Sequence, residues 1–81
     1  MNRKQLENRF ASYPDVVTLP EFREMLGGIG DSTARKLVRN NNVNHYCIRN
    51  TYLIPKNCVI DYLLSTHYEK YRRKLKAHIM L

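Results

Sequence analysis

The chain has 81 residues, which is enough for one small domain with a modest core and too few for an active site buried between two lobes. Hydrophobic residues make up 43% and charged residues 26%, a composition that excludes a disordered chain. Fourteen Lys and Arg against seven Asp and Glu give a net charge of +7, which indicates a polyanionic partner, nucleic acid before membrane.

A short amphipathic helix is predicted over residues 2–12. Leu6 and Phe10 lie one helical turn apart and would share its apolar face. Pro14 ends this helix, because the residue before a proline avoids helical backbone angles. Residues 16–18 then favour a short extended segment.

Two helices joined by a glycine turn follow. The first begins with a capping box of Thr18 and Glu21 and ends at Gly27-Gly28, one of which is expected in the left-handed conformation. The second begins at Asp31, and a run of three asparagines ends it. Its outward face carries short hydrogen-bond donors at the start and long cationic side chains behind them. These residues, called the basic face below, are Ser32, Thr33, Arg35, Lys36 and Arg39.

A two-stranded hairpin is predicted next. Residues 45–49 and 52–54 are rich in aromatic and β-branched side chains, and Asn50-Thr51 would form the turn between them. No acidic residue occurs between Asp31 and Asp61, so the second helix of the pair and the hairpin share one basic stretch.

The rest of the chain predicts one long helix from Lys56 to about His78. Its apolar stripe continues further than a small core requires. We therefore expect Tyr68, Tyr71 and Leu75 to pack on the N-terminal helix or on a second copy of the protein.

Together these elements predict a mostly helical α+β fold, a winged helix-turn-helix with a two-stranded β-hairpin wing and a long C-terminal helix. A helix with a basic outward face fits the major groove of DNA, where arginine can pair with guanine through two hydrogen bonds. The hairpin would reach phosphates or the neighbouring minor groove through Arg49, Asn50 and Thr51, called the wing tip below. Further candidates for phosphate contacts are Lys56, Arg72 and Arg73.

Motifs for catalysis or metal binding are not evident in the sequence. There is no Ser-His-Asp arrangement, no paired carboxylate motif and no phosphate-binding glycine loop. Cys47 and Cys58 lack the spacing of zinc ligands and are interpreted as small apolar packing residues. We expect no catalytic residue, no metal or cofactor and no small-molecule substrate.

The stretch from Thr18 to about Thr66 resembles the excisionase family of winged helix-turn-helix proteins, whose fold is related to the DNA-binding domains of MerR-type regulators. The resemblance rests on TLPEFREMLGGIGDSTARKLVRNN and on YCIRNTYLIPKNCVIDYL. It looks closest to excisionases of Gram-positive conjugative transposons and related phages. It implies a small protein without catalytic activity that binds repeated sites on double-stranded DNA, bends it and assists a tyrosine-type integrase in excision of a mobile element. By position, the basic face would then meet the major groove and the wing tip would form the wing contact.

Two other functions remain open at this point. The same fold serves transcriptional regulators of phages and mobile elements, and a basic helix can also bind an acidic protein partner.

We expect a single domain over 1–81, with a winged helix-turn-helix core at 16–66 and helical extensions at 1–15 and 67–81. The extensions are candidates for self-association on DNA or for a contact with the integrase. The N-terminus lacks the apolar centre of a signal peptide and no run could span a membrane, so a cytoplasmic protein without a membrane partner is expected.

Overall fold

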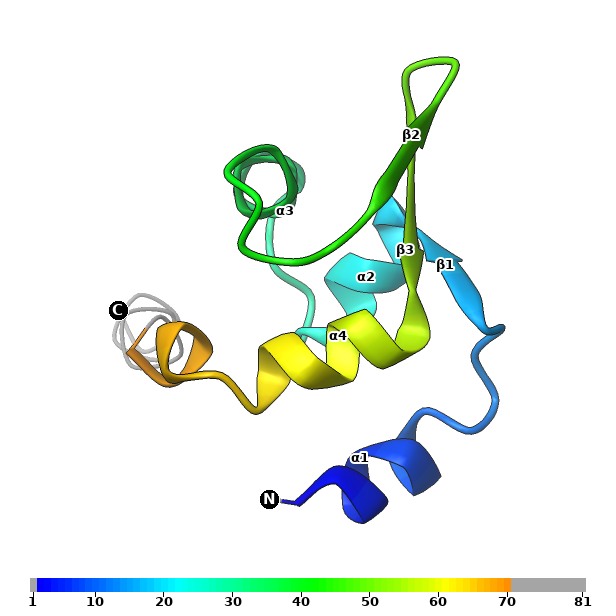
Figure 1. Ribbon diagram of the computed structural model, residues 1–81, viewed down its shortest axis with the longest axis vertical. Helices are drawn as coiled ribbons and strands as arrows, with labels where there is room; N and C mark the ends of the chain where they lie inside the picture. Colours follow the sequence, from blue (N-terminus) through cyan, green and yellow to red (C-terminus); the bar gives the residue numbers. More distant parts are fainter. Residues whose placement is uncertain (1, 71–81) are drawn as a thin grey trace.

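The computed structural model describes residues 2–70 and has the α+β architecture shown in Figure 1. A further helical segment, outside the labelled elements, begins at Thr66 and continues to Lys70. The labelled elements, in chain order, are α1 (Arg3–Arg9), β1 (Val16–Thr18), α2 (Leu19–Met25), α3 (Asp31–Arg39), β2 (Tyr46–Ile48), β3 (Thr51–Pro55) and α4 (Lys56–Leu63).

Helix α1 is shorter than the sequence predicts. The Asn2 side chain accepts a hydrogen bond from the backbone N–H of Gln5 at 2.9 Å, and the Gln5 side chain accepts one from Asn2 at 3.0 Å, so a capping box begins the helix. The helix ends at Arg9, and the chain then tightens into turns before Pro14. Leu6 and Phe10 are buried, as their spacing predicts.

The three strands form one antiparallel sheet in the order β1-β3-β2. The predicted two-stranded hairpin is therefore only part of the sheet, because the extended segment at 16–18 pairs with β3 from the other side. Val17 lies opposite Ile54, and both are fully buried. The face of the sheet that carries these two side chains therefore covers the core.

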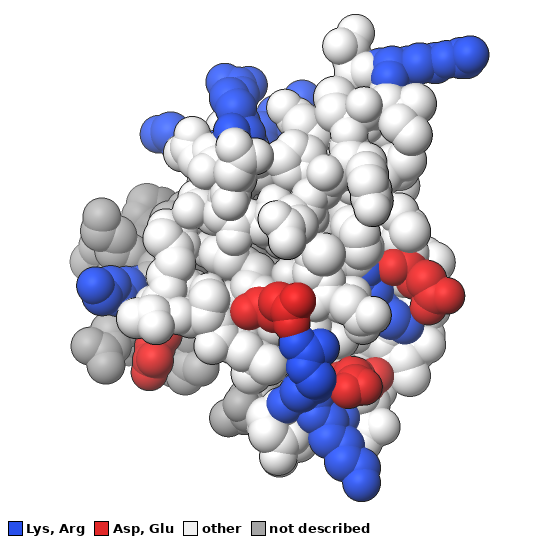
Figure 2. All heavy atoms as spheres, in the orientation of Figure 1, with Lys and Arg blue, Asp and Glu red and all other residues white. Residues whose placement is uncertain are grey.

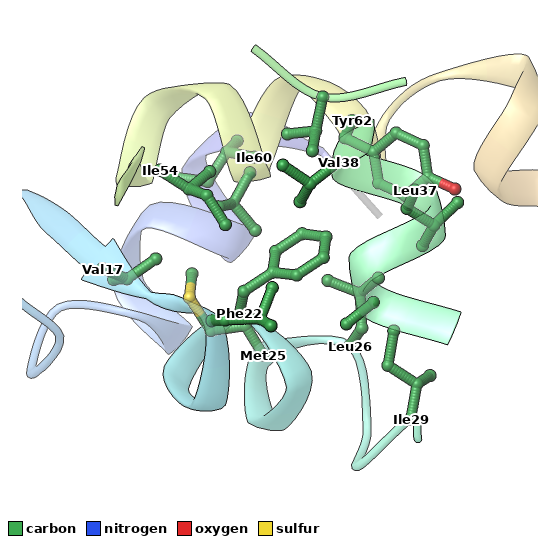
Figure 3. Close-up of a cluster of buried hydrophobic side chains, with 14 of the residues drawn as sticks. Val17, Phe22, Met25, Leu26, Ile29, Leu37, Val38, Ile54, Ile60 and Tyr62 are labelled. Carbon is green, nitrogen blue, oxygen red and sulfur yellow. The ribbon is translucent and has the colours of Figure 1, made fainter. Parts of the chain in front are cut away.

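The core gathers side chains from the four labelled helices, from β1 and β3 and from the loops between them. Figure 3 shows the Phe22 ring at the centre of the cluster, with Val17 on one side and Leu37 on the other. Burying side chains of this size provides most of the stability of a small domain. The buried residues are Leu6, Phe10, Val17, Leu19, Phe22, Met25, Leu26, Ile29, Ala34, Leu37, Val38, Val43, Ile54, Val59, Ile60 and Tyr62.

The prediction of one long C-terminal helix is wrong within the described residues. α4 ends at Leu63, and the next helical segment begins at Thr66, directly after Ser65. The Ser65 hydroxyl oxygen accepts a hydrogen bond from the backbone N–H of Tyr68 at 3.2 Å, which is the geometry of an N-cap. Tyr68 packs half-buried against the core, as expected, whereas Tyr71 and Leu75 lie outside the described residues.

Candidate nucleic-acid interface

Helix α3 has two faces of opposite character. Ala34, Leu37 and Val38 point into the core and are almost completely buried. Ser32, Arg35, Lys36 and Arg39 are exposed, and Thr33 is half-buried. The five residues of the basic face line one shallow, open depression of about 300 Å³. The structure therefore brings together the whole set that the helical spacing predicts.

The orientation of α3 is set by the turn that joins it to α2. Gly27 and Gly28 both have positive φ angles, 87° and 85°, where the sequence led us to expect only one left-handed residue. Within the turn, the Arg23 guanidinium donates a hydrogen bond from Nε to the carbonyl oxygen of Ile29 at 2.9 Å. The turn is thus braced by a side chain from α2 immediately before α3 begins.

The hairpin turn lies one residue earlier than the sequence predicts. Ile48 and Thr51 are cross-strand partners, so the two turn residues are Arg49 and Asn50. Both have positive φ angles, 51° and 65°, as a type I′ turn requires. Thr51 is instead the first residue of β3. All three wing-tip residues are exposed, so they remain available to a ligand.

The basic face and the wing tip stand at the same end of the molecule (Figure 1). Figure 2 shows Lys and Arg side chains projecting there over α3 and the hairpin, and no Asp or Glu of the described residues is visible at that end in this view. Helix and hairpin thus offer positive charge to a single polyanion approaching from one direction.

The cations at this end differ in their partners. Arg35 donates from Nε to Oδ2 of Asp31 at 2.7 Å, one helical turn away on the same helix. Lys36, Arg39 and Arg49 form no ion pair with any residue between 2 and 70. At this end of the described chain, these three side chains are therefore free to neutralise phosphates.

Lys56 does not belong to this surface. Its ammonium group donates a hydrogen bond to the backbone carbonyl of Tyr13 at 2.9 Å, a residue 43 positions earlier, and its own backbone N–H bonds to Asp15. The side chain therefore ties the start of α4 to the segment before β1, and the phosphate contact at Lys56 stays a prediction. Arg72 and Arg73 lie outside the described residues.

One exposed feature beside the wing is not predicted from the sequence. Tyr46 and Ile48 of β2 are 63% and 56% exposed, and Val16 of β1 is 45% exposed. The register places them on the face of the sheet opposite the one that carries Val17 and Ile54. Side chains alternate between the two faces of a strand, so the positions of residues 46–48 could have predicted this exposed apolar face. The hairpin carries apolar side chains on both faces, however, and the sequence does not show which face is exposed.

The two cysteines occupy different environments. Cys58 is half-buried and packs against the core, in agreement with its interpretation as a packing residue. Cys47 is exposed on β2, so that interpretation is wrong for Cys47. No group of three His, Cys, Asp or Glu side chains within residues 2–70 is placed to hold a metal ion.

The described helices include none whose length and apolar character would let it cross a lipid bilayer. Comparison with known proteins adds no relative, since no family model, no curated protein and no solved structure matches the chain.

Proposed function

We propose that this protein is a sequence-specific DNA-binding architectural protein of the excisionase type, which assists a tyrosine-type integrase in excising a mobile element. The observation that carries the proposal is the common position of the basic face and the wing tip at one end of the molecule. Helix α3 lies in the major groove, where base edges present distinct patterns of donors and acceptors. The wing tip contacts the backbone beside the groove.

Electrostatics supports a nucleic acid as the ligand. Three cations without ion-pair partners stand at the end where helix and hairpin meet the solvent. Side chains of this kind fix a protein on the phosphate backbone, while base contacts select the sequence. Ser32 and Thr33 at the start of α3 add short donors for base or phosphate oxygens.

An architectural role follows from the small size of this surface. One helix of nine residues and one hairpin tip cover a short piece of DNA, so a single copy binds weakly. Several copies on adjacent sites give a stable complex and bend the duplex, which costs on the order of 1–6 kcal/mol for 40–90°. The bent complex then assists the integrase without altering the chemistry of strand exchange.

DNA binding is tested first, with duplexes selected from a random library. Lys36→Ala is expected to weaken binding, because Lys36 lies on the basic face without an ion-pair partner. Lys4→Ala is the matched control, since it removes the same charge from exposed α1 at the opposite end of the molecule. Equal affinity for both variants would contradict the proposed interface.

The excisionase role is tested by an excision assay with the element's own integrase, combined with circular-permutation gel shifts. We expect excision to depend on the protein and the shifts to report bent DNA carrying several copies. Unchanged excision, together with altered transcription from a nearby promoter, would instead identify a transcriptional regulator.

A further inference from the structure

Asp31 is the only acidic residue between Glu24 and Asp61, and it stands in the first turn of the helix that carries the basic face. A carboxylate near a surface that binds a polyanion opposes binding, because like charges repel. Its favourable interaction with the helix dipole explains part of its presence. The arrangement of its two oxygens indicates a second role.

Each carboxylate oxygen of Asp31 faces a different arginine. Oδ2 accepts the hydrogen bond from Nε of Arg35 at 2.7 Å, and Oδ1 lies 4.0 Å from Nη1 of Arg23. Arg23 is itself fixed by its hydrogen bond to the Ile29 carbonyl in the turn before α3. The Arg35 side chain is therefore linked through Asp31 to a braced part of the backbone.

The hydrogen bond from Nε limits what Arg35 can offer to a ligand. An arginine has five N–H donors in a planar fork, and here the one on Nε is already used. The four donors on the two terminal nitrogens remain, side by side, and two of them match the O6 and N7 acceptors of a guanine edge. A phosphate at the same place would bring its negative charge close to the Asp31 carboxylate, whereas a guanine edge is neutral.

We propose that Asp31 is a specificity-determining positioning residue, which holds Arg35 for a base edge and disfavours its use as a phosphate contact. This inference rests on the proposed DNA-binding function and assigns different tasks to the cations of one helix. Arg35 reads sequence, while Lys36 and Arg39, without carboxylate partners among the described residues, hold the backbone. Specificity then has two sources: the contact of Arg35 with a guanine edge is strengthened, and binding to DNA without that guanine is weakened.

Asp31→Asn tests the proposal through the ratio of dissociation constants for scrambled and selected duplexes. The variant is expected to lower this ratio roughly 10-fold, within the range for losing one bidentate base contact. Tighter binding to scrambled DNA should account for part of the change, because Arg35 released from Asp31 can pair with a phosphate. Asp61→Asn is the matched control, since Asp61 is exposed and pairs with Arg3 of α1; its ratio should remain that of the wild type.

Two further variants separate positioning from a general effect of charge. In an Arg35→Ala background, Asp31→Asn should not lower the ratio of dissociation constants further, because no guanidinium is left for Asp31 to hold. Arg35→Lys keeps the positive charge without the planar fork, and it should lose selectivity even with Asp31 in place. Thermal unfolding of each variant checks that the fold is intact.

The outcomes distinguish this inference from the function on which it rests. An unchanged ratio in Asp31→Asn, or an equal loss with and without Arg35, would overturn the role of Asp31 while leaving DNA binding established. A wild-type protein that selects no duplex at all would reject the proposed function, and the inference with it.

Discussion

Arg49 adopts a left-handed backbone conformation at the hairpin turn, with φ at 51°. The left-handed region costs a residue other than glycine roughly 1–2 kcal/mol, and asparagine and aspartate tolerate it better. A charged side chain is therefore held in an unfavourable conformation at the exposed tip of the hairpin. This is consistent with a residue retained for a ligand rather than for stability.

Replacing Arg49 should separate stability from binding. We expect Arg49→Asn to raise the free energy of unfolding by about 1 kcal/mol, because asparagine tolerates the left-handed region. The same variant should bind selected and scrambled duplexes equally less well, since a phosphate contact is lost. Urea unfolding and fluorescence anisotropy measure the two effects.

Asn50→Ala is expected to change the stability of the same turn in the opposite direction to Arg49→Asn. Asn50 also has a positive φ, 65°, and alanine does not favour it, so stability should fall. A decrease in stability for Arg49→Asn would contradict the explanation based on backbone conformation.

Lys56 and Lys36 are lysines in different surroundings. Lys56→Met removes the hydrogen bond to the Tyr13 carbonyl and should lower the free energy of unfolding by about 1.5 kcal/mol, as expected for a bond made by a charged donor. DNA affinity should remain unchanged. Lys36→Met is the control and should show the reverse, weaker DNA binding at constant stability. Urea unfolding and anisotropy on both proteins measure the two effects, and reduced DNA affinity in Lys56→Met would instead support the phosphate contact at Lys56.

At the scale of the elements, local signals were enough to predict α2 and α3. The Glu21 carboxylate accepts a hydrogen bond from the Thr18 backbone at 3.0 Å, and the paired glycines end the helix, as the spacing of these residues predicts. The outward position of the basic face follows from helical periodicity alone. The ion pair between Asp31 and Arg35 was not predicted, although their i, i+4 spacing is a signal for it.

Contacts between distant parts of the chain account for what the sequence did not predict. A three-residue strand such as β1 carries no signal for its partner, so its pairing with β3 was missed. Nothing near Lys56 in the sequence indicates the Tyr13 carbonyl as its acceptor. The break after Leu63 was missed because the apolar spacing continues across it, while only the Ser65 cap marks a new start.

That cap is open to a direct test. The Ser65 hydroxyl both accepts from the Tyr68 backbone and donates to the Tyr62 carbonyl at 2.5 Å. Ser65→Ala should lower the free energy of unfolding by about 1 kcal/mol, the usual cost of losing an N-cap. Thr66→Ala removes a hydroxyl from the neighbouring exposed position and should change stability much less. Equal stability of the two variants in urea unfolding would argue against the cap.

For the molecule as a whole, the number of free cations at the proposed interface sets the response to salt. If Lys36, Arg39 and Arg49 each neutralise one phosphate, log K should fall against log salt with a slope of about −2.7. Affinity should then drop about 40-fold between 50 and 200 mM salt. Anisotropy titrations with selected duplex measure the slope, and Arg39→Ala should reduce its magnitude by about 0.9. A flat response would contradict binding through the phosphate backbone.

The sheet order β1-β3-β2 has a consequence for synthesis of the protein on the ribosome. β1 is made first and β3 last of the three strands, yet β3 is the strand that joins the other two. Val17 has no cross-strand partner until Ile54 has left the exit tunnel, so the nascent chain carries an incomplete core until then. Folding of this domain therefore waits for β3, and a ribosome stalled before Thr51 holds a chain whose first strand is still unpaired.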